Sequence, residues 1–197
     1  SAGNININAS EFIKVLGNSS SASSFPSYIN PSVYGSGNGG NITVNTGQLM
    51  LLDGGSIVTP VFASGNAGNL IINARDSIEV IGVNPFFQVA STLGSGTAGK
   101  GSAGNITINT ARLIVKDSGN IISYTLGNGN SGSITINTNE SVEVAGKAEN
   151  FLNPALIVAS ANLREEGFRK YFGLPDIITG ISGNVTINTP SLNVSNE

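Results

Sequence analysis

The chain has 197 residues, of which only 11% are charged, and its formal net charge at pH 7 is −3. The basic residues are scattered, so the clustered basic surface that nucleic acids require is missing and no nucleic-acid partner is expected. There is no Cys and no His, which excludes a disulfide framework, thiol chemistry and the commonest acid–base group near neutral pH.

A short phrase recurs six times along the chain and begins Gly-Asn-Ile-Thr-Ile-Asn-Thr or a near copy. The copies start at Gly3, Gly40, Gly68, Gly104, Gly132 and Gly183. Each joins a small polar turn to a strand in which apolar and polar residues alternate, the pattern of a strand with one buried face. The starts are 37, 28, 36, 28 and 51 residues apart, so longer and shorter coils alternate before an extended last interval. Such a repeat predicts an all-β fold, a parallel β-helix (solenoid) of about six coils stabilised by neighbouring coils.

A second strand follows, and its apolar pair lies one residue further from the leading Gly in one coil type than in the other. The turn before it is Ala74-Arg75-Asp76-Ser77 in one type and Thr110-Ala111-Arg112 in the other. A one-residue slip would turn the apolar face outward, so a bulge or a wider corner must absorb the extra residue.

A third strand completes each coil, giving three short strands and a roughly triangular section. In the shorter coils it is expected at Asp53–Thr59 and Asp117–Ser123. In the longer coils it is assigned to Val89–Ser91 and Val158–Ser160, and the segment Leu93–Ala103 is interpreted as a Gly/Ser/Thr turn.

One Asn position recurs in all six copies and ends the first strand. Its members are Asn8, Asn45, Asn73, Asn109, Asn137 and Asn188. We interpret them as a corner ladder whose side-chain amides bond to the turn backbone or to one another. The functional alternative is a row of sugar-binding amides.

Two segments exceed the coil pattern. Residues 19–39 are rich in Ser and Gly and are expected to form a flexible loop on the wall. Residues 147–181 form an insertion that protrudes from the wall or packs on it, with a short helix predicted near 163–172 because Asn162 and Glu165 resemble a helix N-terminus. The helix either packs its aromatic side on the wall or contacts a ligand. The candidate binding residues are Arg164, Arg169, Lys170, Tyr171 and Phe172.

Enzymatic chemistry is not expected. Parallel β-helices that cleave acidic polysaccharides need clustered carboxylates, whereas the acidic residues here are few and dispersed. The Gly-rich turns carry Asn where calcium-binding nonapeptides need a recurring Asp. We therefore predict no catalytic residue, no metal site and no cofactor. No stretch approaches 18 consecutive apolar residues, so no transmembrane segment is expected either.

The repeat resembles that of a known family. Gly65–Ala74 followed by Asp76–Val80, and Gly104–Thr110 followed by Leu113–Val115, resemble repeats of the filamentous haemagglutinin family, in particular the cyanobacterial exoproteins called haemagglutinin-like or surface-layer-like. The resemblance covers nearly the whole chain except the segment near 147–181. It implies a right-handed parallel β-helix, export through an outer-membrane partner in two-partner secretion, and a fibrous adhesin at the bacterial cell surface. The family's catalytic residues, if any, cannot be carried over, because the matching motifs contain none.

These expectations converge on a structural role. The Asn-Pro-Asn motifs of the family's secretion domain are missing, and the chain opens and stops within its repeat. We therefore expect residues 1–197 to be a single β-helix fragment of a longer array, a stalk segment of a secreted adhesin. The alternative is a carbohydrate-binding module that contacts a glycan or cell-surface receptor through an outer β-face or the 147–181 insertion. A polysaccharide lyase or hydrolase is a third, weaker alternative.

Overall fold

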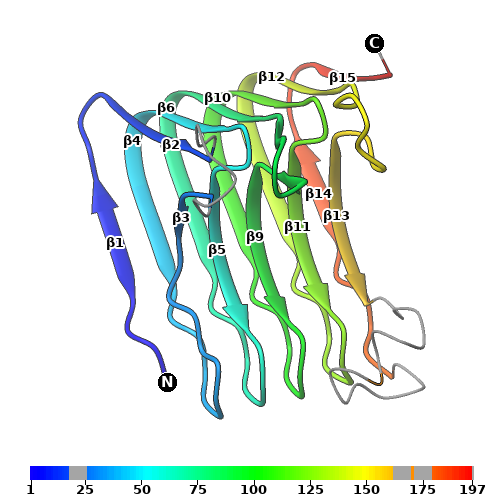
Figure 1. The fold of residues 1–197 in the computed structure, drawn as a ribbon. Coiled ribbons are helices and arrows are strands. Elements are labelled where there is room, and N and C mark those ends of the chain that lie inside the picture. Colours follow the sequence, from blue (N-terminus) through cyan, green and yellow to red (C-terminus); the bar gives the residue numbers. More distant parts are fainter. Residues whose placement is uncertain (18–25, 162–169, 171–178, 197) are drawn as a thin grey trace.

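The computed structural model describes residues 1–17, 26–161, 170 and 179–196. These residues form two parallel sheets and one small antiparallel hairpin (Figure 1). Sheet A contains β1 (Ile5–Asn8), β2 (Phe12–Leu16), β4 (Ile42–Leu52), β6 (Leu70–Ile81), β10 (Ile106–Lys116), β12 (Ile134–Ala145), β14 (Val185–Asn188) and β15 (Leu192–Ser195). Sheet B contains β3 (Tyr28–Ile29), β5 (Ser56–Val61), β9 (Thr92–Thr97), β11 (Asn120–Thr125) and β13 (Leu156–Ala161). The hairpin pairs β7 (Val83–Asn84) with β8 (Val89–Ala90).

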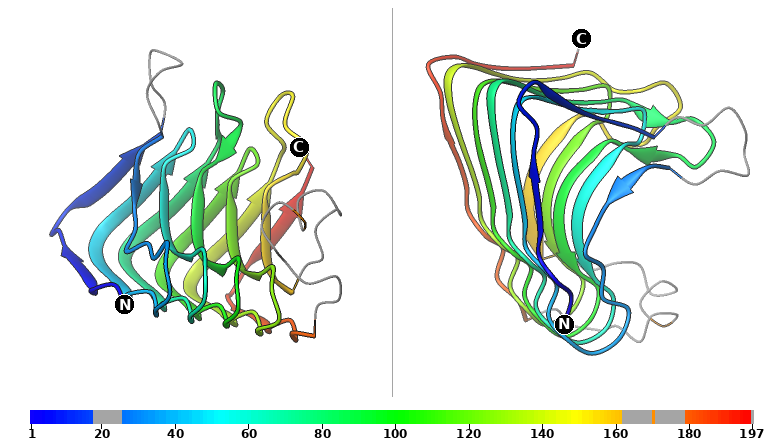
Figure 2. Two further views of the ribbon diagram at one scale, coloured as in Figure 1. Left: turned by 60° about the horizontal axis from the view of Figure 1, so that its bottom comes forward. Right: turned by 90° about the vertical axis from the view of Figure 1, so that its left-hand side faces the viewer.

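The six Gly-led phrases stack side by side in one sheet. Their strands follow the order β1-β4-β6-β10-β12-β14, and every pairing along this path is parallel. Sheet B follows the same progression, β3-β5-β9-β11-β13. Figure 2 shows that each turn of the chain is displaced along one axis and has a roughly triangular outline. This stacking of parallel strands fits the predicted solenoid.

The first and second strands of the repeat are one bent strand in the four central coils. The chain runs without a break through 11 or 12 residues in β4, β6, β10 and β12. Only the outermost coils divide this segment, into β1 and β2 and into β14 and β15. The expectation of three separate strands per coil is therefore wrong for the central coils, because the corner is a bend that keeps its ladder hydrogen bonds.

The predicted one-residue insertion is a β-bulge at this bend. Thr110 pairs with Ala74 and Arg112 with Ser77, so one residue of β10 faces two of β6. Beyond the bulge Leu113 pairs with Ile78, and both side chains are fully buried. The phase of the apolar face is thus restored, as predicted.

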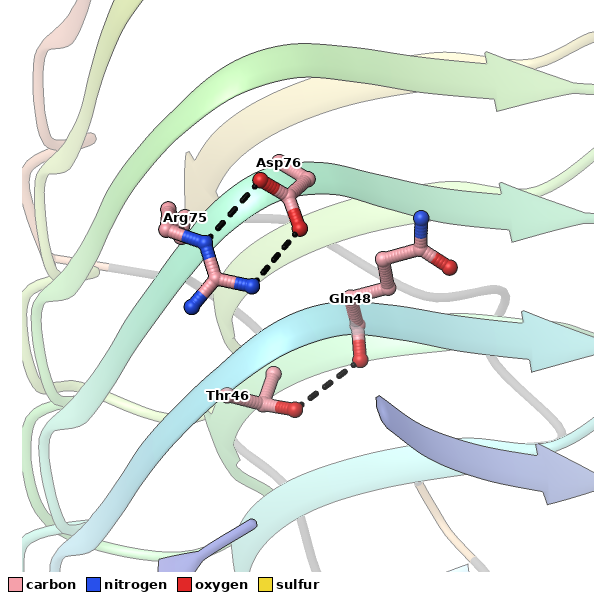
Figure 3. A network of polar contacts seen from close by, with 4 residues as sticks. All are labelled: Thr46, Gln48, Arg75 and Asp76. Atoms are coloured by element: carbon pink, nitrogen blue, oxygen red, sulfur yellow. Dashed lines mark hydrogen bonds and ion pairs between the residues drawn. The ribbon is translucent and has the colours of Figure 1, made fainter. Parts of the chain in front are cut away.

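Figure 3 shows the side chains at this bend. The Arg75 guanidinium donates two hydrogen bonds to the Asp76 carboxylate, at 3.1 and 3.0 Å. In the neighbouring coil, which has one residue fewer here, the Thr46 hydroxyl donates to the backbone oxygen of Gln48 at 3.1 Å. The narrower corner is closed by a local hydrogen bond, whereas the wider corner uses a local pair in β6 and the Arg112–Glu140 contact between coils in β12.

Two predictions about sheet B are wrong. Val89–Ser91 is not the third strand of its coil, because Val89 and Ala90 belong to the hairpin. The third strand is β9, which begins one residue before the segment interpreted as a turn and overlaps it through Thr97, and it pairs in parallel with β5 and β11. The composition of β9 explains why the sequence predicted a turn here, since Thr-Leu-Gly-Ser-Gly-Thr combines strand residues with glycines that normally indicate turns.

Predictions on the two irregular segments are tested only in part. Tyr28–Ile29, inside the expected loop of residues 19–39, is the third strand of the first coil and pairs with β5. The helix predicted near 163–172 lies outside the described residues, except for Lys170. Lys170 alone among the described residues has helical backbone, and no complete helix is described.

The core is a set of aliphatic columns that run along the stack. Val44, Ile72, Ile108 and Ile136 are paired in register and have no exposed surface. Neighbouring coils provide this burial: Val144 is 7% exposed, whereas its register partner Val194 in the last coil is 69% exposed. Since each buried aliphatic side chain contributes about 1.5–3 kcal/mol, these columns are the main source of stability.

Candidate functional site

The structure does not bring the predicted binding residues together. Arg164, Arg169, Tyr171 and Phe172 lie outside the described residues, and Lys170 alone is described, with an exposed side chain. The ligand-contacting insertion therefore stays a prediction. The described surfaces offer other candidates, which we consider from the corners of the coil to its outer faces.

The recurring Asn position forms the predicted ladder. Each side-chain Nδ2 donates to the Oδ1 of the equivalent Asn one coil earlier, at 2.8–2.9 Å, from Asn45 to Asn8, Asn73 to Asn45, Asn109 to Asn73, Asn137 to Asn109 and Asn188 to Asn137. In the interior of the ladder each amide uses its oxygen and one N–H along the stack. This arrangement supports the structural interpretation over a row of sugar-binding amides.

A second and a third ladder lie at the Gly-rich corner and were missed from the sequence. The Oδ1 atoms of Asn41 and Asn69 accept the backbone N–H of the equivalent residue in the next coil, at 2.8 and 2.9 Å. Asn38 and Asn66 do the same at 3.0 and 2.9 Å. The signal was available in the phrase Gly-Asn-x-Gly-Asn, whose two Asn positions also recur at coil spacing.

The close spacing of this corner depends on Gly. A Cβ at Gly68 would overlap the backbone oxygen of Gly40 in the preceding coil. A Cβ at Gly65 would overlap the backbone oxygen of Gly37, and the φ of +143° at Gly65 disfavours any other residue. At these glycines the corner therefore stacks backbone on backbone, and the Asn side chains beside them bond to the next coil.

A buried column of hydroxyl groups joins sheet B to the Gly corner. Thr59, Ser95 and Ser123 are register partners and have no exposed surface. The Ser95 hydroxyl donates to the Gly68 oxygen at 3.0 Å and accepts from the Gly104 N–H at 2.8 Å. Buried polar groups are tolerated when they are satisfied in this way, so the column replaces aliphatic packing with specific hydrogen bonds.

The outer face of sheet B contains a hollow of about 340 Å³. Its floor is low at Gly94 of β9, which has no side chain, between Val58 of β5 and Ile122 of β11. Aromatic rings gather around it. Tyr34 and Phe62 are stacked with ring centroids 4.9 Å apart and an interplanar angle of 10°. The Tyr124 ring lies against Gly96, where a Cβ would overlap it.

A second hollow of about 850 Å³ continues along the same face. It shares Val89, Thr92, Ile122 and Tyr124 with the first and extends across β13 to Phe151. We call the two hollows together the axial trough. The trough crosses the strands of sheet B, so it runs along the axis of the stack.

The lining of the axial trough is uncharged and combines apolar side chains with a smaller number of hydroxyls and amides. None of its described lining residues is Asp, Glu, Lys or Arg. Its polar groups are hydroxyls and amides, among them Asn30, Ser32, Thr92 and Asn120. The Asn120 Oδ1 is buried and has no hydrogen-bond partner among the described residues. An unpaired buried acceptor costs free energy, and with less than 1 Å² exposed this oxygen does not open onto the trough.

Some of the charged groups of sheet A form ion pairs on its outer surface. Arg112 contacts Glu140 at 3.1 Å and Lys116 contacts Glu143 at 2.8 Å, with all four side chains at least about one third exposed. Such solvated pairs contribute little to stability.

The described residues contain no cluster of three His, Cys, Asp or Glu side chains placed to hold a metal ion. They also contain no helix of the length and apolar character needed to cross a membrane. No protein-family model, curated protein or solved structure matches this chain.

Proposed function

We propose that this chain is a structural stalk segment of a secreted, cell-surface fibrous adhesin, folded as a right-handed parallel β-helix. The observation that supports the proposal best is the continuity of the Asn ladder, in which side-chain hydrogen bonds join all six coils. The ladder adds to the main-chain bonds between coils, which also lie along the axis.

The physical consequence is stiffness along one direction. In a stack where each coil contacts only its neighbours, every interface must be kept intact for the segment to keep its length. Here each central interface combines aliphatic columns, main-chain pairing and ladders at two corners. Such a segment is suited to hold an adhesive end at a fixed distance from the cell.

The repeat's resemblance to the filamentous haemagglutinin family supports the cellular part of the proposal. The full-length protein would leave the cell through an outer-membrane secretion partner, and its adhesive contact would be a glycan or a cell-surface receptor. The segment itself would carry out no catalysis.

Immunogold labelling of intact cells with antibodies raised against residues 1–197 tests this proposal. We expect gold on the outside of unpermeabilised cells, at a distance from the outer membrane that grows by roughly 200 Å when twenty tandem copies of residues 68–131, two coils each, are inserted into the full-length protein. Labelling that requires permeabilisation would refute the surface location. An unchanged distance after this insertion would refute the stalk role.

A further inference from the structure

The outward-facing residues of sheet B form rows along the stack. Val58, Gly94, Ile122 and Val158 are register partners in successive strands. The glycine in this row leaves a depression between larger apolar neighbours. A ligand in the axial trough therefore meets near-equivalent positions, one per strand, at intervals of about 4.8 Å.

Three aromatic side chains that line the trough are about half exposed or more. Tyr34 is 75% exposed, Tyr28 55% and Phe62 45%, although Tyr34 and Phe62 already stack on each other. Exposed aromatic groups that are gathered in one place indicate a binding surface more often than a structural one. Flat rings are suited to ligands that present a flat apolar face.

The remaining chemistry of the trough restricts the ligand further. An uncharged lining offers no ionic partner to an acidic polysaccharide, a nucleic acid or a charged peptide. The hydroxyls of Ser32 and Thr92 donate to Asn30 Oδ1 and to the Ala90 oxygen, which leaves their oxygens as acceptors for a ligand rich in hydroxyl groups. Pyranose rings have both properties, because their C–H faces stack on aromatic rings while their hydroxyl edges exchange hydrogen bonds.

We propose that the axial trough binds a linear, uncharged polysaccharide that lies along the axis of the stack, across the strands of sheet B. The stacked pair Tyr34 and Phe62 and the ring of Tyr124 form its platforms, and the hydroxyl oxygens of Ser32 and Thr92 accept hydrogen bonds from sugar hydroxyls. This inference goes beyond the stalk role and does not depend on it.

The length of the trough predicts the size of ligand. Five strands at this spacing extend over roughly 19 Å, the length of several sugar rings in an extended chain. Affinity should therefore rise with each added sugar until the trough is filled and then level off. A site for a single terminal sugar would show no such rise.

Affinity gel electrophoresis of the purified chain tests the proposal, with hydroxyethylcellulose, glucomannan and xyloglucan as neutral probes and polygalacturonate as the charged probe. We expect at least one neutral probe to retard the chain and polygalacturonate to leave its mobility unchanged. The double variant Tyr34→Ala/Phe62→Ala should bind about tenfold more weakly. Phe12→Ala, which removes an aromatic ring on β2 that is 56% exposed and lies outside the trough, should bind like the wild type.

A second variant fills the trough instead of removing its walls. A Cβ at Gly94 would lie 3.2 Å from Thr92 Cγ2 and 3.3 Å from Val58 Cγ1, so the side chain of Gly94→Val would stand in the floor. It should abolish retardation while urea denaturation still shows a cooperative transition. Retardation by polygalacturonate alone, by no probe, or equally of the wild type and the Tyr34/Phe62 variant would overturn the proposal. So would sedimentation velocity showing that the same rings join two copies of this chain while no probe is bound.

Discussion

Sheet A and sheet B are built on the same coil spacing but differ in what they place between coils. Sheet A stacks aliphatic side chains without interruption, for example Val44, Ile72 and Ile108, and several of its outer charges form ion pairs. Sheet B replaces part of this packing with the Thr59–Ser95–Ser123 hydroxyl column and with the glycines of β9. The difference shows that the regular aliphatic columns stabilise the stack, whereas the irregular positions of sheet B, such as the glycines of β9, shape the axial trough.

The largest effect is expected in the columns of sheet A. Ile72→Ala should lower the free energy of unfolding by about 2–5 kcal/mol, because it opens a cavity between two neighbouring coils that cannot collapse independently. Ile122→Ala removes the same atoms from the outer face of sheet B and should cost less than about 1 kcal/mol. Urea denaturation of both variants measures the contrast, and equal costs would contradict the assignment of the core.

The hydroxyl column of sheet B should come next. Ser95→Ala leaves the buried Gly104 N–H without its partner, so it should lower the free energy of unfolding by about 1–3 kcal/mol. The matched control is Ser64→Ala, which removes an exposed hydroxyl and should change stability by less than about 0.5 kcal/mol. If the two variants unfold at the same urea concentration, the column is not a structural element.

The Asn ladder should contribute less per residue, because it lies at the surface. Asn73→Ala breaks the bonds to Asn45 and from Asn109 and should cost about 0.5–1.5 kcal/mol. Asn139→Ala, an exposed amide outside the ladder, provides the comparison. Thermal denaturation that fails to separate these two variants would leave the ladder without an energetic role.

The smallest effect is expected for the ion pairs on sheet A. Arg112→Ala should cost no more than about 0.5 kcal/mol at low ionic strength, and the cost should vanish in about 1 M salt, because both partners are half-exposed. A loss that persists at high salt would mean that the Arg112 side chain contributes through packing instead.

The contrast between the sheets also explains what could be predicted from the sequence. In sheet A the inward residues, the Asn ladder and the bulge recur at fixed positions in each copy, so periodicity alone located them. In sheet B the strand β9 carries Gly94 and Gly96, which have low strand propensity, and it was mistaken for a turn. Its pairing with β5 and β11 overrides that local preference.

The axial trough could not be predicted for a related reason. Tyr34 and Phe62 are equivalent positions in successive coils, since Val33 pairs with Val61, but Tyr34 lies in a segment that the sequence assigned to a loop. Tyr124, within β11, is register-equivalent to Pro60 and not to Phe62, so no single period locates all three rings on one face. The binding residues predicted at 164–172 depended on local composition, which carries no information about that face.

Small-angle X-ray scattering of a chain with residues 68–131 duplicated in register tests the central claim most directly. Gly68 and Gly132 begin equivalent phrases two coils apart, so each duplication should insert two complete coils. If coils are held by their neighbours along one axis, the maximum dimension should grow by about 10 Å per duplication while the radius of gyration of the cross-section stays constant. A particle that instead grows in cross-section, or keeps its length, would contradict the account.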